Sequence, residues 1–151
     1  MPKLDRAFAG DAAARFEGLP ADAKPLWGTL TRDGVVAHLA GAFEYSMGRI
    51  EPLPRQTGVP VPRLLGWLLV NGIWSIPKNV KFKGNDGNVA PAIQTEGGIE
   101  KLREVMEEFI VLVEKGETPQ GTHPIFGKFS PMQWLKFHRV HLMHHLKQFG
   151  A

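Results

Sequence analysis

The C-terminal segment from Ser130 to Gly150 constrains the fold most strongly, because its sequence marks both ends of one long helix. Ser130 is a favourable N-cap, Pro131 suits the first helical position and Gln133 can complete a capping box. Gly150 can end the helix in the left-handed conformation. Apolar residues repeat along one side of this segment, which predicts a helix packed against other helices: Leu135, Leu142, Leu146 and Phe149.

Histidines gather on this helix. Four of the six histidines in the chain lie within eight residues: His138, His141, His144 and His145. His141 and His145 are four residues apart, so their Cβ atoms lie roughly 6 Å apart on a helix. At 100° per residue the same stripe carries Trp134, His138 and Gln148. Two buried neutral imidazoles side by side each need a partner, and one divalent cation satisfies both, so His141 and His145 are predicted metal ligands.

A third ligand has to come from outside the last helix, and His38 is the better candidate. It lies in a helix predicted from Thr31 to Arg49, among small residues that would leave its imidazole accessible, including Gly34, Gly41 and Ala42. A core histidine whose ring nitrogen bonds a carbonyl or carboxylate is the alternative for His38. For His123, His138 and His144 taken singly, a structural or solvated histidine is the more common case.

These motifs resemble the DinB/YfiT-like superfamily of metal-dependent enzymes. The resemblance covers most of the chain and is carried by Trp27–Thr31, Val36–Leu39 and the terminal block His141–Gly150. The stretches His123–Lys128 and Pro131–Trp134 resemble a branch whose biochemical role is undefined. The resemblance implies a four-helix bundle with a three-histidine metal site, one ligand from an early helix and two from the HxxxH of the last: His38, His141 and His145.

Three imidazoles leave a coordination position open, which is typical of catalytic sites, and imidazole suits both Ni²⁺ and Zn²⁺. Relatives in the superfamily include thiol-dependent transferases, so the resemblance implies either thiol transfer or hydrolysis of a small-molecule substrate, with a low-molecular-weight thiol as one partner. A non-catalytic metal- or ligand-binding bundle with a regulatory or protective role is the alternative.

Other side chains are candidates for the substrate pocket or for orienting the ligands. Tyr45 lies two turns after His38 on the same helix face, although an ordinary core aromatic explains it equally well, whereas Glu44 should point elsewhere. Four more candidates come from the last helix and the loop before it: His123, Trp134, His138 and Gln148.

Composition narrows the functional classes. A chain of 151 residues with 43% hydrophobic and 22% charged residues predicts one soluble domain spanning 1–151. The absence of cysteine excludes disulfides, a thiolate nucleophile and cysteine-ligated zinc, and fits a reducing compartment. No signal-peptide core follows Met1, so we expect a cytoplasmic protein. The net charge of +3 is dispersed and Lys78, Lys81 and Lys83 are assigned to a solvated loop, which disfavours nucleic acid.

Helical periodicity predicts an all-α fold, a four-helix bundle with an additional short helix. The expected helices are Asp11–Glu17, Thr31–Arg49, a segment between Pro62 and Ile76, Gly98–Lys115 and the histidine helix. The apolar run in the third is too short to span a membrane, but Trp67 and Trp74 at i, i+7 suggest, as a hypothesis, either a membrane-surface contact or a homodimer interface. The long connectors Glu51–Pro60 and Lys83–Asn88 are expected to wall a pocket.

Overall fold

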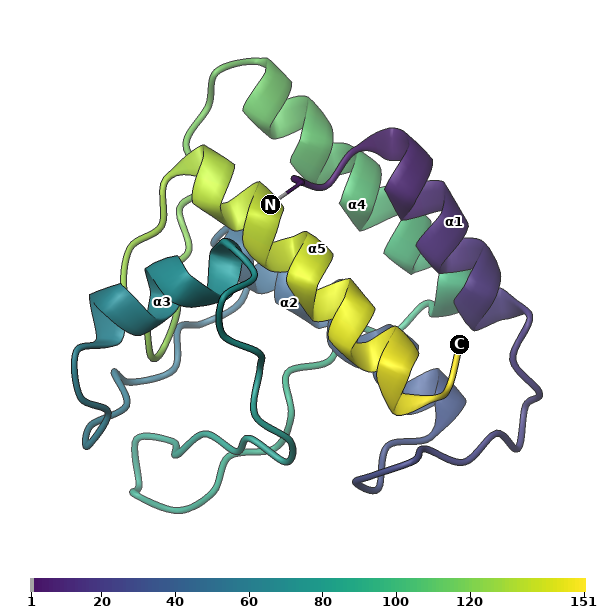
Figure 1. The fold of residues 1–151 in the computed structure, drawn as a ribbon, viewed down its shortest axis with the longest axis horizontal. Coiled ribbons are helices and arrows are strands. Elements are labelled where there is room, and N and C mark those ends of the chain that lie inside the picture. The colour runs from purple at the N-terminus through teal and green to yellow at the C-terminus, as the bar shows by residue number, and fades with distance from the viewer. Residues whose placement is uncertain (1) are drawn as a thin grey trace.

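Five α-helices make up the fold of the computed structural model, which describes residues 2–151 (Figure 1). They are α1 (Arg6–Glu17), α2 (Arg32–Ser46), α3 (Pro62–Val70), α4 (Gly98–Glu114) and α5 (Pro131–Gln148). Within residues 2–151 there is no β-strand, only two isolated bridges in loops. The prediction of an all-α protein is therefore confirmed. In the same residues, no helix combines the length and the apolar content that crossing a bilayer requires.

Four helices pack around a common core. α4 contacts α1 and α2, and α5 contacts the same two helices, so the contacts close a ring, while α3 packs against α5 from outside (Figure 1). Large side chains from each of the four helices are fully buried in one hydrophobic cluster: Phe16, Phe43, Phe109 and Leu142. α4 is strongly amphipathic and buries its apolar stripe against the other helices, whereas most residues of α2 are buried.

The helix ends follow local capping rules. Ser130 accepts the backbone N–H of Gln133 and the side chain of Gln133 accepts that of Ser130, so the predicted capping box is present. Gly150 has the predicted left-handed conformation, with φ of +69°. α1 begins earlier than predicted, because Asp5 caps it by accepting the N–H of Phe8 at 2.8 Å.

The third helix is shorter than its apolar pattern suggested. It ends at Val70, where the Asn71 side chain donates to the carbonyl of Trp67 at 2.8 Å and Gly72 turns left-handed. Trp67 and Trp74 consequently do not share a helix face: Trp67 is half-exposed, whereas Trp74 meets the ring of Phe126 edge-on. The pattern that suggested a homodimer interface is absent, and a homodimer stays a prediction.

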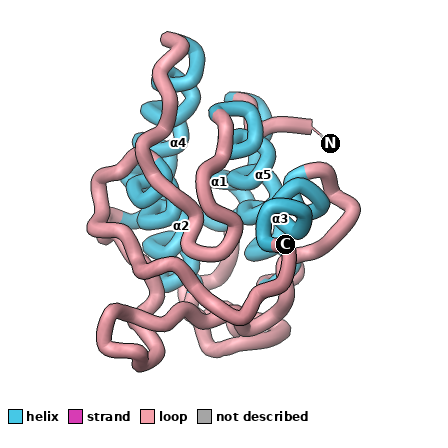
Figure 2. The backbone as a smooth tube through the Cα atoms, turned by 90° about the vertical axis from the view of Figure 1, so that its left-hand side faces the viewer, coloured by secondary structure: helices cyan, strands magenta, loops and turns pink. Residues whose placement is uncertain are grey.

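Long loops gather beyond one side of the helices, as Figure 2 shows. The loop between α3 and α4 returns to α2, where the N–H of Thr95 donates to the carbonyl of Ala37 at 2.9 Å. This approach needs a glycine at position 41, because a Cβ there would lie only 2.9 Å from the backbone nitrogen of Gln94. A loop, rather than a neighbouring helix, therefore occupies the space left by the small residues of α2.

Candidate metal centre

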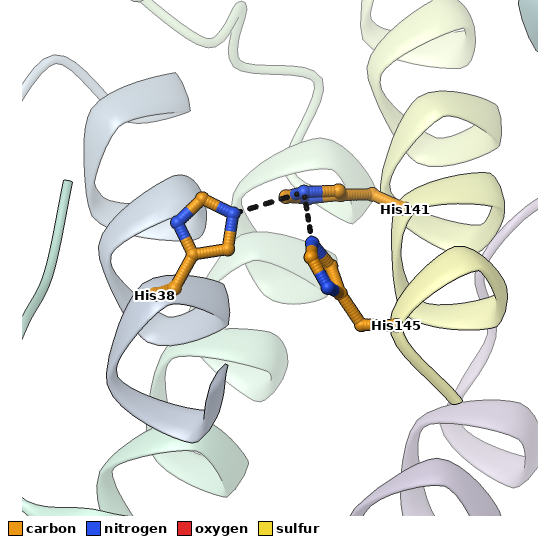
Figure 3. Close-up of side chains that lie close together, drawn as sticks. All are labelled: His38, His141 and His145. Atoms are coloured by element: carbon orange, nitrogen blue, oxygen red, sulfur yellow. Dashed lines mark hydrogen bonds between the residues drawn. The ribbon is translucent and has the colours of Figure 1, made fainter. Parts of the chain in front are cut away.

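Three imidazoles converge between α2 and α5 (Figure 3). The Nε2 atom of His141 lies 3.2 Å from Nε2 of His38 and 3.1 Å from Nε2 of His145. A helical spacing of four residues aligns His141 with His145, and the contact of α2 with α5 brings His38 opposite them. The structure thus brings together the three histidines singled out in the sequence.

The outer nitrogens of two of these rings fix their tautomers. Nδ1 of His38 lies 3.1 Å from the carbonyl oxygen of Ile93, which can only accept, so Nδ1 carries the proton. Nδ1 of His145 likewise donates to Oε1 of Gln148 at 2.7 Å, and the Gln148 amide is oriented by its own donation to the carbonyl of Trp27 at 2.9 Å. Both rings therefore direct an unprotonated Nε2 into the cluster, as metal-ligating histidines do.

His141 cannot satisfy both neighbours with hydrogen bonds. It carries one ring proton when neutral, so its Nε2 can donate to His38 or to His145 but not fully to both. Its buried Nδ1 has no hydrogen-bond partner among the described residues. Two nitrogen ligands at about 2.0–2.1 Å from a metal lie about 2.9–3.4 Å apart for octahedral to tetrahedral angles, which brackets the observed separations. Three converging lone pairs with too few protons fit a cation.

Burial keeps these imidazoles in the neutral form that binds metal. Desolvation lowers the pKa of His38, and lowers that of His141 well below its usual range, with the neighbouring histidines adding to the effect. Desolvation and the nearby His38 lower the pKa of His145 to about 3. All three imidazoles are therefore uncharged at neutral pH, and among the described residues no carboxylate borders the cavity beside them.

The histidines open onto a cavity of about 490 Å³. Its wall includes Tyr45, His123 and Trp134, which were predicted pocket residues, together with Gln148. Tyr45 accepts the N–H of Leu53 at 3.0 Å, and burial raises the pKa of its hydroxyl, so the hydroxyl stays protonated.

His123 shapes the loop that enters α5. Its Nδ1 accepts the backbone N–H groups of Ile125 and Phe126 at 3.1 and 3.2 Å, inside a turn closed by the bridge between His123 and Gly127. Desolvation lowers its pKa to about 3. His123 thus borders the cavity but lies outside the three-histidine cluster.

His138 has a structural role instead of the predicted contact with ligands or substrate. Its Nε2 donates to the hydroxyl of Ser46 at 2.8 Å, because the Ser46 proton is already donated to the carbonyl of Phe43 at 2.7 Å. The His138 ring stacks on that of Phe43 at 3.9 Å, and it does not border the cavity. Glu44, as expected, points elsewhere and pairs with Arg49 and Lys101.

Several site residues were missed because they come from loops. The carbonyl of Ile93 accepts from His38, and that of Trp27 accepts from Gln148. Lys81 is exposed, as predicted for a solvated loop, and it also borders the cavity. Backbone carbonyls carry no sequence signal. Of the predicted pocket walls, Glu51–Pro60 contributes Val59, whereas the turn Lys83–Asn88 contributes nothing and its flanks, 76–82 and 89–93, form the wall instead.

A protein-family model described as "Protein of unknown function (DUF1569)" matches residues 77–151. The matched part contains α4, α5, the cavity-lining loop and two of the three histidines, His141 and His145, but not His38. No curated protein and no solved structure matches the chain.

Proposed function

We propose that the chain binds one divalent metal ion through His38, His141 and His145 and uses it as an enzyme on a small molecule in the adjoining cavity. The observation that carries the proposal is the convergence of three Nε2 atoms, two of them with tautomers fixed from behind. A structural histidine cluster would have no need to direct the unprotonated Nε2 atoms of both His38 and His145 at the same nitrogen of His141.

Zinc and nickel are the ions we propose, since both accept imidazole nitrogen and the chain contains no cysteine. With three protein ligands, the ion would keep an open position at which it could activate water for hydrolysis or a thiol for group transfer. The protein's own contribution is positional: Gln148 and the Ile93 carbonyl hold two rings, and the cavity provides space for a ligand beside them.

The helix order supports a DinB/YfiT-type arrangement as part of this proposal. One ligand comes from α2 and two come from an HxxxH pair on α5, which is the distribution that the sequence resemblance implies. A thiol-dependent transferase and a hydrolase both fit such a centre. We favour transfer, because within residues 2–151 no Asp or Glu borders the cavity to act as a base toward water.

The same lack of a carboxylate favours one second candidate, a non-catalytic binding bundle. A site with a bound metal and largely apolar walls but no carboxylate can capture a ligand without transforming it. The hydroxyl group of Tyr45 borders the cavity. It accepts the backbone N–H of Leu53, so its own proton is available to a ligand.

Metal stoichiometry and affinity test the centre directly. The wild-type chain, His38→Ala, His141→Ala and His145→Ala would be loaded with zinc and titrated against a competing chelator. His144→Ala is the matched control, because His144 lies on the same helix but packs edge-on against Trp27 and is not one of the converging ligands. We expect about one ion per chain in wild type and control, and an affinity loss of at least about 10-fold in each ligand variant.

Equal zinc affinity in all five proteins would overturn the metal centre. For the enzymatic part, metal-loaded wild type and a folded His38→Ala variant would be assayed for alkyl transfer to a small thiol and for ester and amide hydrolysis. Turnover that survives in the variant would exclude His38 from the catalytic centre. Zinc binding by the wild type without turnover of any of these substrates would favour the binding bundle.

A further inference from the structure

The charge of the cavity is unbalanced once a metal is bound. Imidazole binds a metal ion as a neutral ligand, so His38, His141 and His145 leave the two positive charges of the ion uncompensated. Within residues 2–151, no Asp or Glu borders the cavity, and the lining residue with a permanent charge is Lys81, which adds a further positive charge. A buried charge in a low-dielectric site is costly unless a counter-charge is close.

The rest of the wall is apolar and aromatic. Side chains from separate loops and from α5 face the same space, among them Trp74, Ile76, Phe82, Phe126 and Phe137. The volume of about 490 Å³ suits an organic molecule of moderate size. A polar ligand rich in hydroxyl or amide groups would lose its water there and find few hydrogen-bond partners.

We infer that the cavity takes an organic anion with an apolar body: the anionic atom completes the coordination of the ion, and the body fills the space between the aromatic walls. The inference rests on the proposed metal centre and narrows its substrate class. Lys81 provides long-range attraction for the same negative charge. A neutral apolar compound lacks the counter-charge that the centre requires, and a small inorganic anion leaves the walls without contact.

Tryptophan fluorescence provides a readout independent of activity. Three of the four tryptophans border the cavity, Trp27, Trp74 and Trp134, whereas Trp67 is half-exposed on α3. A Trp67→Phe background would therefore report mainly on the cavity. The probes are 4-phenylbutyrate, its uncharged amide and acetate, titrated into the zinc-loaded full chain. They separate the contributions of the charge and of the apolar body.

We expect 4-phenylbutyrate to bind at least about 10-fold more tightly than either its amide or acetate. The preference over the amide should shrink severalfold in Lys81→Met and vanish in zinc-free His141→Ala. Lys83→Met is the matched control, because Lys83 lies two residues away but does not border the cavity, and it should behave as wild type.

Zinc content measured on each sample separates this inference from the proposed function. A chain that binds zinc yet binds the amide as tightly as the anion, or binds neither, overturns the ligand class and leaves the metal centre standing. A chain that binds no zinc overturns the metal centre, and the ligand inference with it.

Discussion

Replacing Gly41 by alanine should weaken both the fold and the metal centre, although alanine is the better helix former. In an exposed helix interior this change stabilises a protein by roughly 0.5–1 kcal/mol. At position 41 the new Cβ would lie 2.9 Å from the backbone nitrogen of Gln94 and 2.9 Å from Cγ2 of Ile93. Backbone atoms cannot rotate away as a flexible side chain would, so the loop must shift away from α2.

Two hydrogen bonds depend on the position of that loop. The N–H of Thr95 donates to Ala37 and Nδ1 of His38 donates to Ile93. Losing a buried hydrogen-bond partner costs about 1–3 kcal/mol, which exceeds the gain in helix propensity. We therefore expect Gly41→Ala to lower the unfolding free energy by about 1–2 kcal/mol net for one lost hydrogen bond, and the Tm by about 2–4 °C for each kcal/mol. Because His38 loses its orienting carbonyl, zinc affinity should fall about 10–100-fold.

Gly10→Ala is the matched control. Gly10 lies inside α1, and nothing approaches its Cβ position within 4 Å, so that variant should be slightly stabilised and bind zinc as wild type does. Urea unfolding of the zinc-free proteins and chelator competition on the loaded proteins measure the two effects. If Gly41→Ala matched Gly10→Ala in both, the close approach of the loop and its link to His38 would be refuted.

Three further predictions concern the site and its surroundings. Gln148→Met should reduce zinc affinity about 10–100-fold in chelator competition, because His145 loses the acceptor that fixes its tautomer, and an unchanged affinity would contradict that role. Burial lowers the pKa of His138 to about 3, so near pH 6.5 this side chain takes up a proton in the unfolded chain but not in the native chain. The contribution of His138 to zinc-free stability should therefore be constant above about pH 6.5 and fall below it, by about 2 kcal/mol at pH 5. In urea unfolding at pH 7.5 and 5, His138→Met should show a smaller pH difference than wild type, and an equal one would exclude His138 as a source. Chelating the metal should lower the Tm of wild type but not that of His141→Ala, and an equal shift in both would place the ion elsewhere.

What the sequence predicted well depends on interactions between near neighbours. A helix cap joins residues three apart, as Ser130 and Gln133 do, and the pairing of His141 with His145 needs only the helical repeat. These features do not depend on the tertiary structure, because all the interacting residues belong to one helix and its cap. The first helix shows the limit of the method: its cap, Asp5, precedes an Ala- and Gly-containing stretch whose apolar period is weak.

Helical periodicity placed His138 and His145 on one stripe but could not distinguish their neighbours. They are two turns apart along α5, and α2 runs antiparallel beside this stretch, so His138 meets Ser46 at the end of α2 while His145 meets His38 near its middle. The angle around a helix is a local quantity. Which residue of a neighbouring helix lies opposite a given position depends on tertiary packing, and only the structure supplies it.

The ligands are held by parts of the chain that are far apart in sequence, which makes the centre a property of the whole fold. The Ile93 carbonyl reaches His38 from the loop before α4, and the Trp27 carbonyl reaches Gln148 from the loop before α2. The backbone N–H of Leu26 also donates to the carbonyl of Gln148, so the loop between α1 and α2 makes two hydrogen bonds with the end of α5. No single helix orients all three imidazoles. Metal bound at the proposed centre would therefore stabilise the packed arrangement of both loops on α2 and α5, and any ion bound by the unfolded chain would lack these constraints.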